Sequence, residues 1–478
     1  MQSQLSTLSL SLRFRKFRKF MFNRILIANR GEIALRIIRA CHEMGIETVV
    51  VYSDVDADSM HVQLADEAIC IGPAPAQESY LKIANIISAA EIADVDAIHP
   101  GYGFLAENMH FVEICDSCKI KFIGPTAQNI QQMGDKAVAR AMMKKAGLPV
   151  IPGSKNIVRT QEEALDIARS IGYPLMIKAV GGGGGKGMRL AHNDVSLVQG
   201  FIMARTEAER AFDCPDVYIE KYIENAKHVE VQILADNYGK VVHLGERDCS
   251  IQRRHQKLLE ETPCIALSQE QRRKIWKLAV KAADSISYRS VGTIEFLLDE
   301  KNDFYFMEMN TRIQVEHPVT EMATGIDIIK EQLRIAAGEH LSFDQKDIVS
   351  HGHVIEWRVN AEDPLNDLAP SPGLIKWVHF PGGPGVRVDT HVYSGYKILP
   401  NYDSMLAKII VHSINREQAI NRMSRCLSEF MIEGPKTTVP LGLEIMNNAM
   451  FKRGKYSIAF FDNFFKEWLI SNPTSKEV

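Results

Sequence analysis

Two glutamates in neighbouring apolar segments are the residues that first suggest chemistry. Residues 291–299 and 304–312 have the composition of strands, and the short polar link between them predicts a hairpin. In that hairpin Glu295 lies opposite Glu308, and two facing carboxylates repel each other. A divalent cation would remove this repulsion, so the pair predicts a metal site.

The same hairpin predicts the neighbours of the glutamate pair. Side chains alternate along a strand, so Asn310 and Arg312 should share the face of both glutamates. The alternation also puts Leu297, Phe304 and Phe306 on this face. Carboxylate and amide oxygens suit Mg²⁺ or Mn²⁺ carrying nucleotide phosphates, whereas zinc prefers His or Cys. The alternative interpretation is a solvated polar face without a metal.

A glycine run at residues 181–185, followed by Lys186, lies between two strand-like segments. It is not a P-loop, because Val180 stands where that motif needs glycine and Gly187 where it needs Ser or Thr. It contains a weak match to G-x-G-x-x-G, but no helix follows where a dinucleotide-binding helix should begin. A flap between strands is therefore predicted, with backbone N–H groups free to approach phosphate oxygens. A plain surface turn is the alternative.

Two polar segments could bind charged ligands. Residues 246–257 (ERDCSIQRRHQK) carry many hydrogen-bond donors, which suit a multiply charged ligand, although a charged surface loop is the favoured interpretation of this segment alone. Residues 311–318 (TRIQVEHP) place a cation, an amide and a carboxylate directly after the predicted metal ligands. These groups could hold a small anion and act as a base, but the signal is weak by itself.

The elements that position these groups begin with a βαβ unit. Residues 24–29 and 47–52 are apolar strands, and residues 31–44 between them have apolar side chains at helical spacing. Such a unit predicts a parallel sheet in a doubly wound domain that continues to residue 133. The middle of the chain predicts an α+β region with much antiparallel sheet, and a last α+β unit follows from residue 351.

Composition excludes several functional classes. The formal net charge of −3 gives no basis for binding polyanions, so no nucleic-acid partner is predicted. No apolar run approaches the roughly 18 residues that span a bilayer, so no membrane partner is predicted. The eight cysteines are scattered, and the pair Cys115 and Cys118 lacks a second pair for zinc, so reduced thiols are predicted.

The first twenty residues differ from the rest of the chain. Residues 1–20 contain no acid, several serines and a basic cluster. This composition is typical of a transit peptide, which would send the chain to an organelle. The favoured interpretation is a disordered extension ahead of a true start at Met21, because the folded pattern begins there. The protein is then expected in the cytoplasm.

The motifs in this order resemble the biotin carboxylase family. The resemblance rests on the glycine run and four segments: IANRGEIALR at 27–36, HPGYGFLAEN at 99–108, residues 246–257, and EMNTRIQVEHPVTE at 308–321. It extends from about Met21 to about residue 465. It implies an ATP-grasp fold of mixed α/β and α+β class, with a Rossmann-like N-terminal domain at 21–133. An ATP-grasp domain at 134–350, with its flap subdomain at about 150–223, and a C-terminal α+β domain at 351–466 would follow.

The resemblance also implies residue roles at the matching positions. Metal ligands would be Glu295, Glu308 and Asn310. ATP would be bound by Lys136, Lys178, Gly184, Gly185, Glu220, Lys221, Tyr222, Ile223, His228, Gln252, His255 and Leu297, together with Glu295 and Glu308. Bicarbonate would be bound by Lys257, Arg312, Gln314, Val315 and Arg358. Catalysis would depend on Lys257, Arg312, Glu316 as the base, and Arg358, which would also bind the ureido oxygen of biotin.

The implied reaction is the ATP- and bicarbonate-dependent carboxylation of biotin on a carrier protein, through carboxyphosphate and with Mg²⁺ or Mn²⁺. Expected partners are a biotin carboxyl carrier protein, carboxyltransferase subunits and a second copy of the chain in a homodimer. The A-M-K-M biotin-attachment motif is absent, so a separate subunit is expected. Acetyl-CoA, for fatty acid synthesis, is the first choice of final acceptor, and pyruvate or another acyl-CoA is the alternative. Lys186 and Trp357 depart slightly from the family pattern.

Two other classes stay open at this point. Another ATP-grasp ligase, of the carbamoyl-phosphate or carboxyaminoimidazole-ribonucleotide synthetase type, would differ by ATP cleavage that does not depend on biotin. A nucleotide-binding regulator without activity is the other class, and the complete set of Glu295, Glu308, Asn310, Arg312 and Glu316 argues against it.

Overall fold

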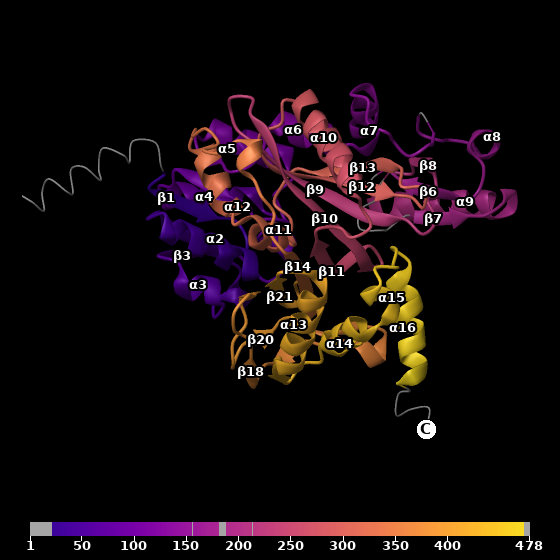
Figure 1. The fold of residues 1–478 in the computed structure, drawn as a ribbon. Helices are drawn as coiled ribbons and strands as arrows, with labels where there is room; N and C mark the ends of the chain where they lie inside the picture. The colour runs from indigo at the N-terminus through magenta and orange to yellow at the C-terminus, as the bar shows by residue number, and fades with distance from the viewer. Residues whose placement is uncertain (1–21, 155, 181–187, 213, 473–478) are drawn as a thin grey trace, which may run out of the picture.

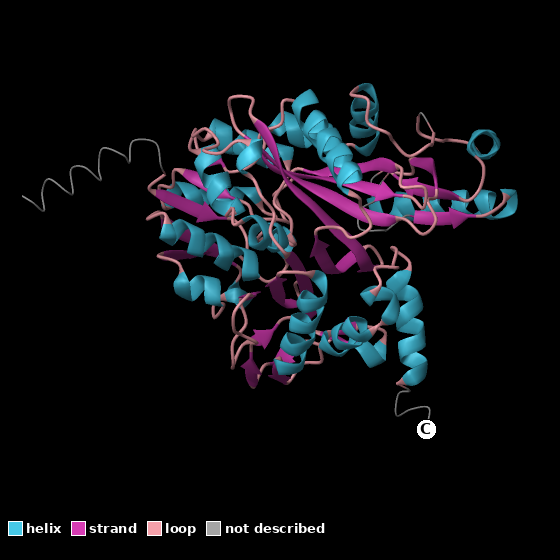
Figure 2. Ribbon diagram, in the orientation of Figure 1, coloured by secondary structure: helices cyan, strands magenta, loops and turns pink. Residues whose placement is uncertain are grey.

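The structure is a computed structural model that describes residues 22–154, 156–180, 188–212 and 214–472. Figure 1 shows an N-terminal unit in indigo, a central unit that extends to the right, and a C-terminal unit in orange and yellow below them. Helices flank the sheets in all three (Figure 2). The predicted leader and the flap residues Gly184 and Gly185 lie outside the described residues. No described helix is long and apolar enough to cross a bilayer.

The N-terminal unit is built on a five-stranded sheet in the order β3-β2-β1-β4-β5, with every pair parallel, as the βαβ pattern predicts. Gly45 has a φ of 70° just beyond α2, a conformation that ordinary residues avoid, and it ends the helix where the sequence predicts. The elements are β1 (Arg24–Ile27), α2 (Gly31–Glu43), β2 (Glu47–Tyr52), α3 (Met60–Leu64), β3 (Glu67–Cys70), α4 (Ile83–Ile92), β4 (Ala97–His99), α5 (Met109–Ser117), β5 (Lys121–Phe122), α6 (Ala127–Gly134) and α7 (Lys136–Lys145).

The strands on either side of the predicted flap belong to a small antiparallel sheet in the order β7-β6-β8. Its apolar side chains pack beneath two helices, and a capping box between Thr160 and Glu163 begins the first of them. The elements are α8 (Gln161–Ile171), β6 (Leu175–Ala179), β7 (Met188–Ala191), α9 (Asp194–Phe212) and β8 (Val217–Lys221).

An eight-stranded antiparallel sheet joins the central and C-terminal units in the order β13-β12-β9-β10-β11-β14-β21-β19. The last three strands belong to the segment predicted as a separate final unit, yet β14 pairs directly with β11, and β21 and β19 follow it in the same sheet. The edge of β11 is therefore covered. The strands are β9 (Lys227–Ala235), β10 (Val241–Arg253), β11 (Gln256–Thr262), β12 (Ser290–Leu298), β13 (Phe304–Asn310), β14 (His353–Asn360), β19 (Val386–Thr390) and β21 (Met405–Ser413).

Further α-helices and short strand pairs belong to the described part of the chain. The helices are α10 (Gln269–Ser285), α11 (His317–Thr324), α12 (Ile328–Ala336), α13 (Arg416–Glu429), α14 (Val439–Asn447), α15 (Ala449–Lys452) and α16 (Phe460–Ser471). The strand pairs are β15 (Glu362–Asp363) with β16 (Ala369–Pro370), β17 (Gly373–Leu374) with β20 (Lys397–Ile398), and β18 (Trp377–His379) with β22 (Met431–Glu433).

The β12–β13 hairpin has the predicted register at its functional end but not at its turn. Glu295 pairs with Glu308, whereas Phe296 pairs with Phe306, so Met307 is an extra residue on β13. Such a bulge reverses the alternation of side chains. The prediction that Phe304 and Phe306 share the face of the glutamates is therefore wrong in register, since both pack in one hydrophobic core with Phe296, although Phe306 also borders the cavity that the glutamates line.

Trp357 is the largest fully buried side chain in the C-terminal unit. It packs against α14 at Gly442, where an added Cβ would lie only 2.8 Å from the indole ring. Because glycine has no Cβ, Gly442 leaves space for the indole ring of Trp357. Trp357 thus belongs to the core that holds β14 in place, while its neighbour Arg358 lines a cavity.

Candidate active site

A cavity of about 1070 Å³ lies between the three units. It is lined by Tyr102 of the N-terminal unit, by the flap sheet, by the middle of the large sheet and by Ile458 just ahead of α16. Every predicted site residue that the structure describes lines this cavity: Lys136, Lys178, Glu220, Lys221, Tyr222, Ile223, His228, Gln252, His255, Lys257, Glu295, Leu297, Glu308, Asn310, Arg312, Gln314, Val315, Glu316 and Arg358.

Glu295 is the most heavily contacted carboxylate in the predicted metal set. Its Oε1 accepts hydrogen bonds from Lys257 (2.9 Å), Gln314 (2.7 Å) and Asn310 (2.9 Å). Its Oε2 lies 3.0 Å from Nε2 of His228. Burial alone would raise the pKa of Glu295, but Lys257 and His228 outweigh it and hold this pKa well below its usual value. Glu295 is therefore ionised.

Glu308 faces the cavity more openly, with 34% of its side chain exposed and Lys136 at 3.5 Å. Asp135 accepts hydrogen bonds from the first backbone N–H groups of α7 and so fixes the start of the helix that carries Lys136. The donor set of Glu295, Glu308 and Asn310 consists of oxygens at the paired end of one hairpin, which fits a hard divalent cation. These residues would hold such an ion beside the cavity.

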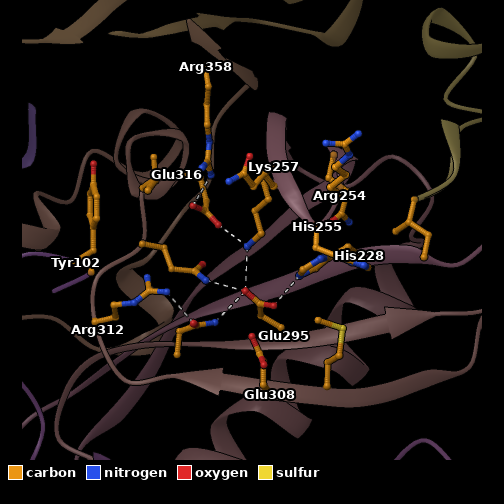
Figure 3. A pocket seen from close by; sticks show the side chains of 18 of the residues that line it. Tyr102, His228, Arg254, His255, Lys257, Glu295, Glu308, Arg312, Glu316 and Arg358 are labelled. Carbon is orange, nitrogen blue, oxygen red and sulfur yellow. Dashed lines mark hydrogen bonds and ion pairs between the residues drawn. The ribbon is translucent and has the colours of Figure 1, made fainter. Parts of the chain in front are cut away.

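Lys257 contacts three carboxylates in the cavity wall, and Figure 3 shows it between Glu316 and Glu295. Its Nζ donates to Glu230 (2.6 Å), Glu295 (2.9 Å) and Glu316 (2.5 Å). Burial would lower the pKa of Lys257, but the three carboxylates outweigh it and raise this pKa well above its usual value. These contacts favour the charged ammonium, which joins the metal end of the cavity to Glu316.

Glu316 lies between two cations. Its Oε1 accepts from Lys257, and its Oε2 accepts from Arg358 at 2.9 Å. Burial would raise the pKa of Glu316, but Lys257 and Arg358 outweigh it and depress this pKa. Arg358 also donates to Glu260 at 2.7 Å, and burial raises the pKa of Glu260 to about 7. The structure therefore presents an ionised carboxylate in direct contact with two donors suited to anions.

Arg312 and Gln314 form the wall next to Glu316. Arg312 donates to Glu107 (2.9 Å) and to Asn310 (3.0 Å). Gln314 donates to Glu295 and accepts from the buried Arg247 at 3.1 Å. These hydrogen bonds fix the orientation of both side chains, so a small anion in the cavity would meet donors that are already oriented.

The other end of the cavity combines cations with apolar walls. Lys178 on β6 donates to Glu220 on β8 at 2.7 Å, across the flap sheet. Burial lowers the pKa of His255, and the nearby Lys178 lowers it further. Leu297 and Ile458 supply apolar surface there. A ligand with a flat base and a chain of phosphates fits this combination of apolar and cationic surface.

The sequence matches known families along nearly its whole length. Residues 21–130 match "Biotin carboxylase, N-terminal domain", residues 135–344 match "Carbamoyl-phosphate synthase L chain, ATP binding domain", and residues 356–463 match "Biotin carboxylase C-terminal domain". The chain is 55% identical to Biotin carboxylase 1 of Bacillus subtilis, over 93% of this chain and 99% of that protein. The chain belongs to the biotin carboxylase family.

Other members of the family are named for different carboxylases. A pyruvate carboxylase subunit of Methanothermobacter thermautotrophicus is 53% identical over 93% of this chain and 90% of its own length. The biotin carboxylase domain dimer of Hydrogenobacter thermophilus 2-oxoglutarate carboxylase, solved with MgADP, ADP and bicarbonate, is 51% identical. It covers 93% of this chain and 98% of its own, with a TM-score of 0.89. The ATP-grasp fold expected from the resemblance is confirmed.

Sequence reasoning missed several hydrogen-bond partners in this biotin carboxylase site, of which Glu230, Arg247 and Glu260 are fully buried and Glu107 is exposed. Glu107, Glu230, Arg247 and Glu260 orient the cavity residues but were given no individual role. The signal for Glu230 and Glu260 was present, since each is a carboxylate within an apolar strand. Residues 246–257 are not a surface loop, because β10 runs on to Arg253 and buries Arg247 completely.

Proposed function

We propose that this chain is a biotin carboxylase that uses ATP to carboxylate biotin, with bicarbonate as the carbon source. The observation that carries the proposal is the position of Glu316, an ionised carboxylate held between Lys257 and Arg358 and facing a cavity large enough for a nucleotide. A base flanked by anion-binding donors is what the activation of bicarbonate requires.

In the proposed first stage, Glu316 takes the proton of bicarbonate, whose oxygen then attacks the γ-phosphorus of ATP and releases ADP. Lys257 and Arg312 bind the anion, and Lys136 and Lys178 bind the phosphates. Glu295, Glu308 and Asn310 would hold Mg²⁺, which neutralises charge on the phosphates when it is bound. Bicarbonate would compete with Glu316 for Lys257 and Arg358, which raises the pKa of Glu316 and makes it a stronger base.

In the proposed second stage, carboxyphosphate divides into CO₂ and phosphate. Phosphate takes the N1′ proton of biotin, and N1′ then bonds to CO₂. Arg358 stabilises the negative charge that develops on the ureido oxygen during this step. Exclusion of water protects carboxyphosphate from hydrolysis. We propose that the flap, with Gly184 and Gly185, supplies this exclusion.

The test is an assay with purified protein, ATP, Mg²⁺, bicarbonate and free biotin. ADP release and acid-labile ¹⁴C-carboxybiotin are measured in parallel. We expect both to require bicarbonate and carboxybiotin to require ATP. Lys376→Met serves as a control, because it removes an exposed ion pair with Glu433, and neither residue lines the cavity. This variant should have the activity of the unchanged protein. ATP cleavage that is stimulated by ammonia and not by biotin would favour a carbamoyl-phosphate type of ligase instead.

We further propose that the carboxyl group passes to acetyl-CoA through a biotin carboxyl carrier protein and carboxyltransferase subunits, in fatty acid synthesis. Pyruvate or another acceptor is the alternative, since relatives are named for pyruvate and 2-oxoglutarate carboxylases. Identification of the carrier and transferase that co-purify with the chain distinguishes these outcomes. A homodimer is supported by the dimeric relative, and light scattering tests it.

Two further proposals concern the chain as a whole. The domains are placed at 21–133, 134–350 and 351–466, which the three family matches support. The protein is placed in the cytoplasm, unless residues 1–20 direct it to an organelle. Localisation of fluorescent fusions with and without these residues tests the second proposal.

A further inference from the structure

Lys408 is a completely buried lysine in the middle of β21. It pairs with Arg358 on β14 and with Asp389 on β19, so it lies one strand away from a residue that lines the cavity. A buried ammonium is costly unless it is well paired, because it loses its hydration. Lys408 does not line the cavity itself, and the proposed reaction does not use it.

The contacts of Lys408 lead directly to the proposed base. Its Nζ donates to the backbone oxygen of Val315 at 2.8 Å and lies 3.0 Å from Oε1 of Glu32. The Val315 carbonyl and the Glu316 N–H belong to one planar peptide group. A donor that fixes this carbonyl therefore fixes the backbone from which the Glu316 side chain extends into the cavity.

Glu32 extends the connection to a second wall of the cavity. It lies at the start of α2, is almost fully buried, and also accepts a hydrogen bond from the hydroxyl of Tyr102. Tyr102 lines the cavity on the side of the N-terminal unit, as Figure 3 shows. The path Tyr102–Glu32–Lys408–Val315 thus takes residues from all three units.

We propose that Lys408 is a positioning residue that fixes the Val315–Glu316 peptide for bicarbonate activation and, through Glu32, aligns it with Tyr102. The inference rests on the proposed function. It predicts that the base is correctly oriented only when the three units are docked together. Loss of the ammonium would leave the Val315 carbonyl without its donor and Glu32 without its cation.

The test compares Lys408→Met with Arg416→Met. Arg416 also lies in the C-terminal unit, its side chain is only 13% exposed, and it donates to Glu261 at 2.7 Å. It lines no part of the cavity, so it controls for the loss of a largely buried cation. For Lys408→Met we expect the KM for bicarbonate to rise about tenfold, the kcat for ATP cleavage to fall, and the KM for ATP to change less than about twofold. Arg416→Met should lower thermal stability but leave the KM for bicarbonate unchanged.

A second variant covers the failure of Lys408→Met to fold. The double variant Glu32→Gln with Lys408→Met removes both charges, so it avoids an unpaired buried carboxylate but still leaves Val315 without its donor. It should show the same selective rise in the KM for bicarbonate.

A normal KM for bicarbonate in either folded variant, or an equal rise in both KM values, overturns the inference. Insolubility of both variants overturns it too, because Lys408 is then purely structural. Failure of the proposed function is distinct, since the unchanged protein would then lack biotin carboxylation.

Discussion

Replacement of Arg358 by glutamine should separate the two stages of the proposed reaction. Arg358 donates to Glu260 and to Glu316, and its side chain is 14% exposed, so it faces both the protein and the cavity. Glutamine keeps a similar length and hydrogen-bonding capacity but removes the charge. The second stage needs that charge on the ureido oxygen, whereas the first stage needs mainly Glu316.

The expected magnitudes follow from these contacts. Loss of a charged donor to a developing oxyanion costs about 2.7–4 kcal/mol, so carboxybiotin formation should fall about 10²–10³-fold. Bicarbonate-dependent ATP cleavage should fall less than about tenfold, because Lys257 still contacts Glu316 at 2.5 Å. Removal of Arg358 also removes one cation that depresses the pKa of Glu316, and this makes Glu316 a stronger base.

The assay measures phosphate release and ¹⁴C-carboxybiotin separately, with free biotin in excess. Glu316→Gln is the matched comparison, because it removes the base before ATP is cleaved, so both activities should fall together. An equal loss of both activities in the Arg358→Gln variant would refute the division of labour. Arg358 would then belong to the first stage.

Three other changes test separate parts of the structure. Glu308→Gln should lower ATP cleavage about 10²-fold or more, because it removes a ligand for the divalent cation. The thermal midpoint should stay unchanged, because this side chain is partly exposed. Normal activity at ordinary Mg²⁺ concentrations would contradict the metal site. Burial raises the pKa of Glu260 from 4.5 to about 7, so the folded state binds an extra proton between these pH values and its unfolding free energy falls as pH rises through them. Glu260→Gln should reduce this fall, which urea unfolding at several pH values measures. An unchanged dependence of the unfolding free energy on pH would count against the prediction. Gly442→Ala should destabilise the fold by about 1–3 kcal/mol, because the new Cβ would lie 2.8 Å from Trp357 and 2.9 Å from Leu427; an unchanged denaturation midpoint would show that α14 moves to make room.

Sequence patterns predicted the elements whose partners are close in the chain. The parallel sheet followed from apolar strands alternating with a helix that ends before Gly45, and the opposition of Glu295 and Glu308 followed from a short link between two strands. In each case a short connection leaves few possible arrangements, and the alternation of side chains fixes which face is buried. The extra residue Met307 could not be predicted, because a bulge leaves no clear mark in the hydrophobic pattern.

By itself, the sequence determined the family, through long motifs, and the residue types available for the reaction. Only the tertiary structure decided how those residues meet. Lys257 reaches Glu230 and Glu295 because β9, β10 and β11 lie side by side in one sheet with β12. It reaches Glu316 because α11, which Glu316 precedes, packs against β10 and β11. Lys408 reaches Val315 because β21 joins the same sheet. These contacts link residues far apart in the chain, and such pairings depend on the packing of the whole molecule rather than on local preference.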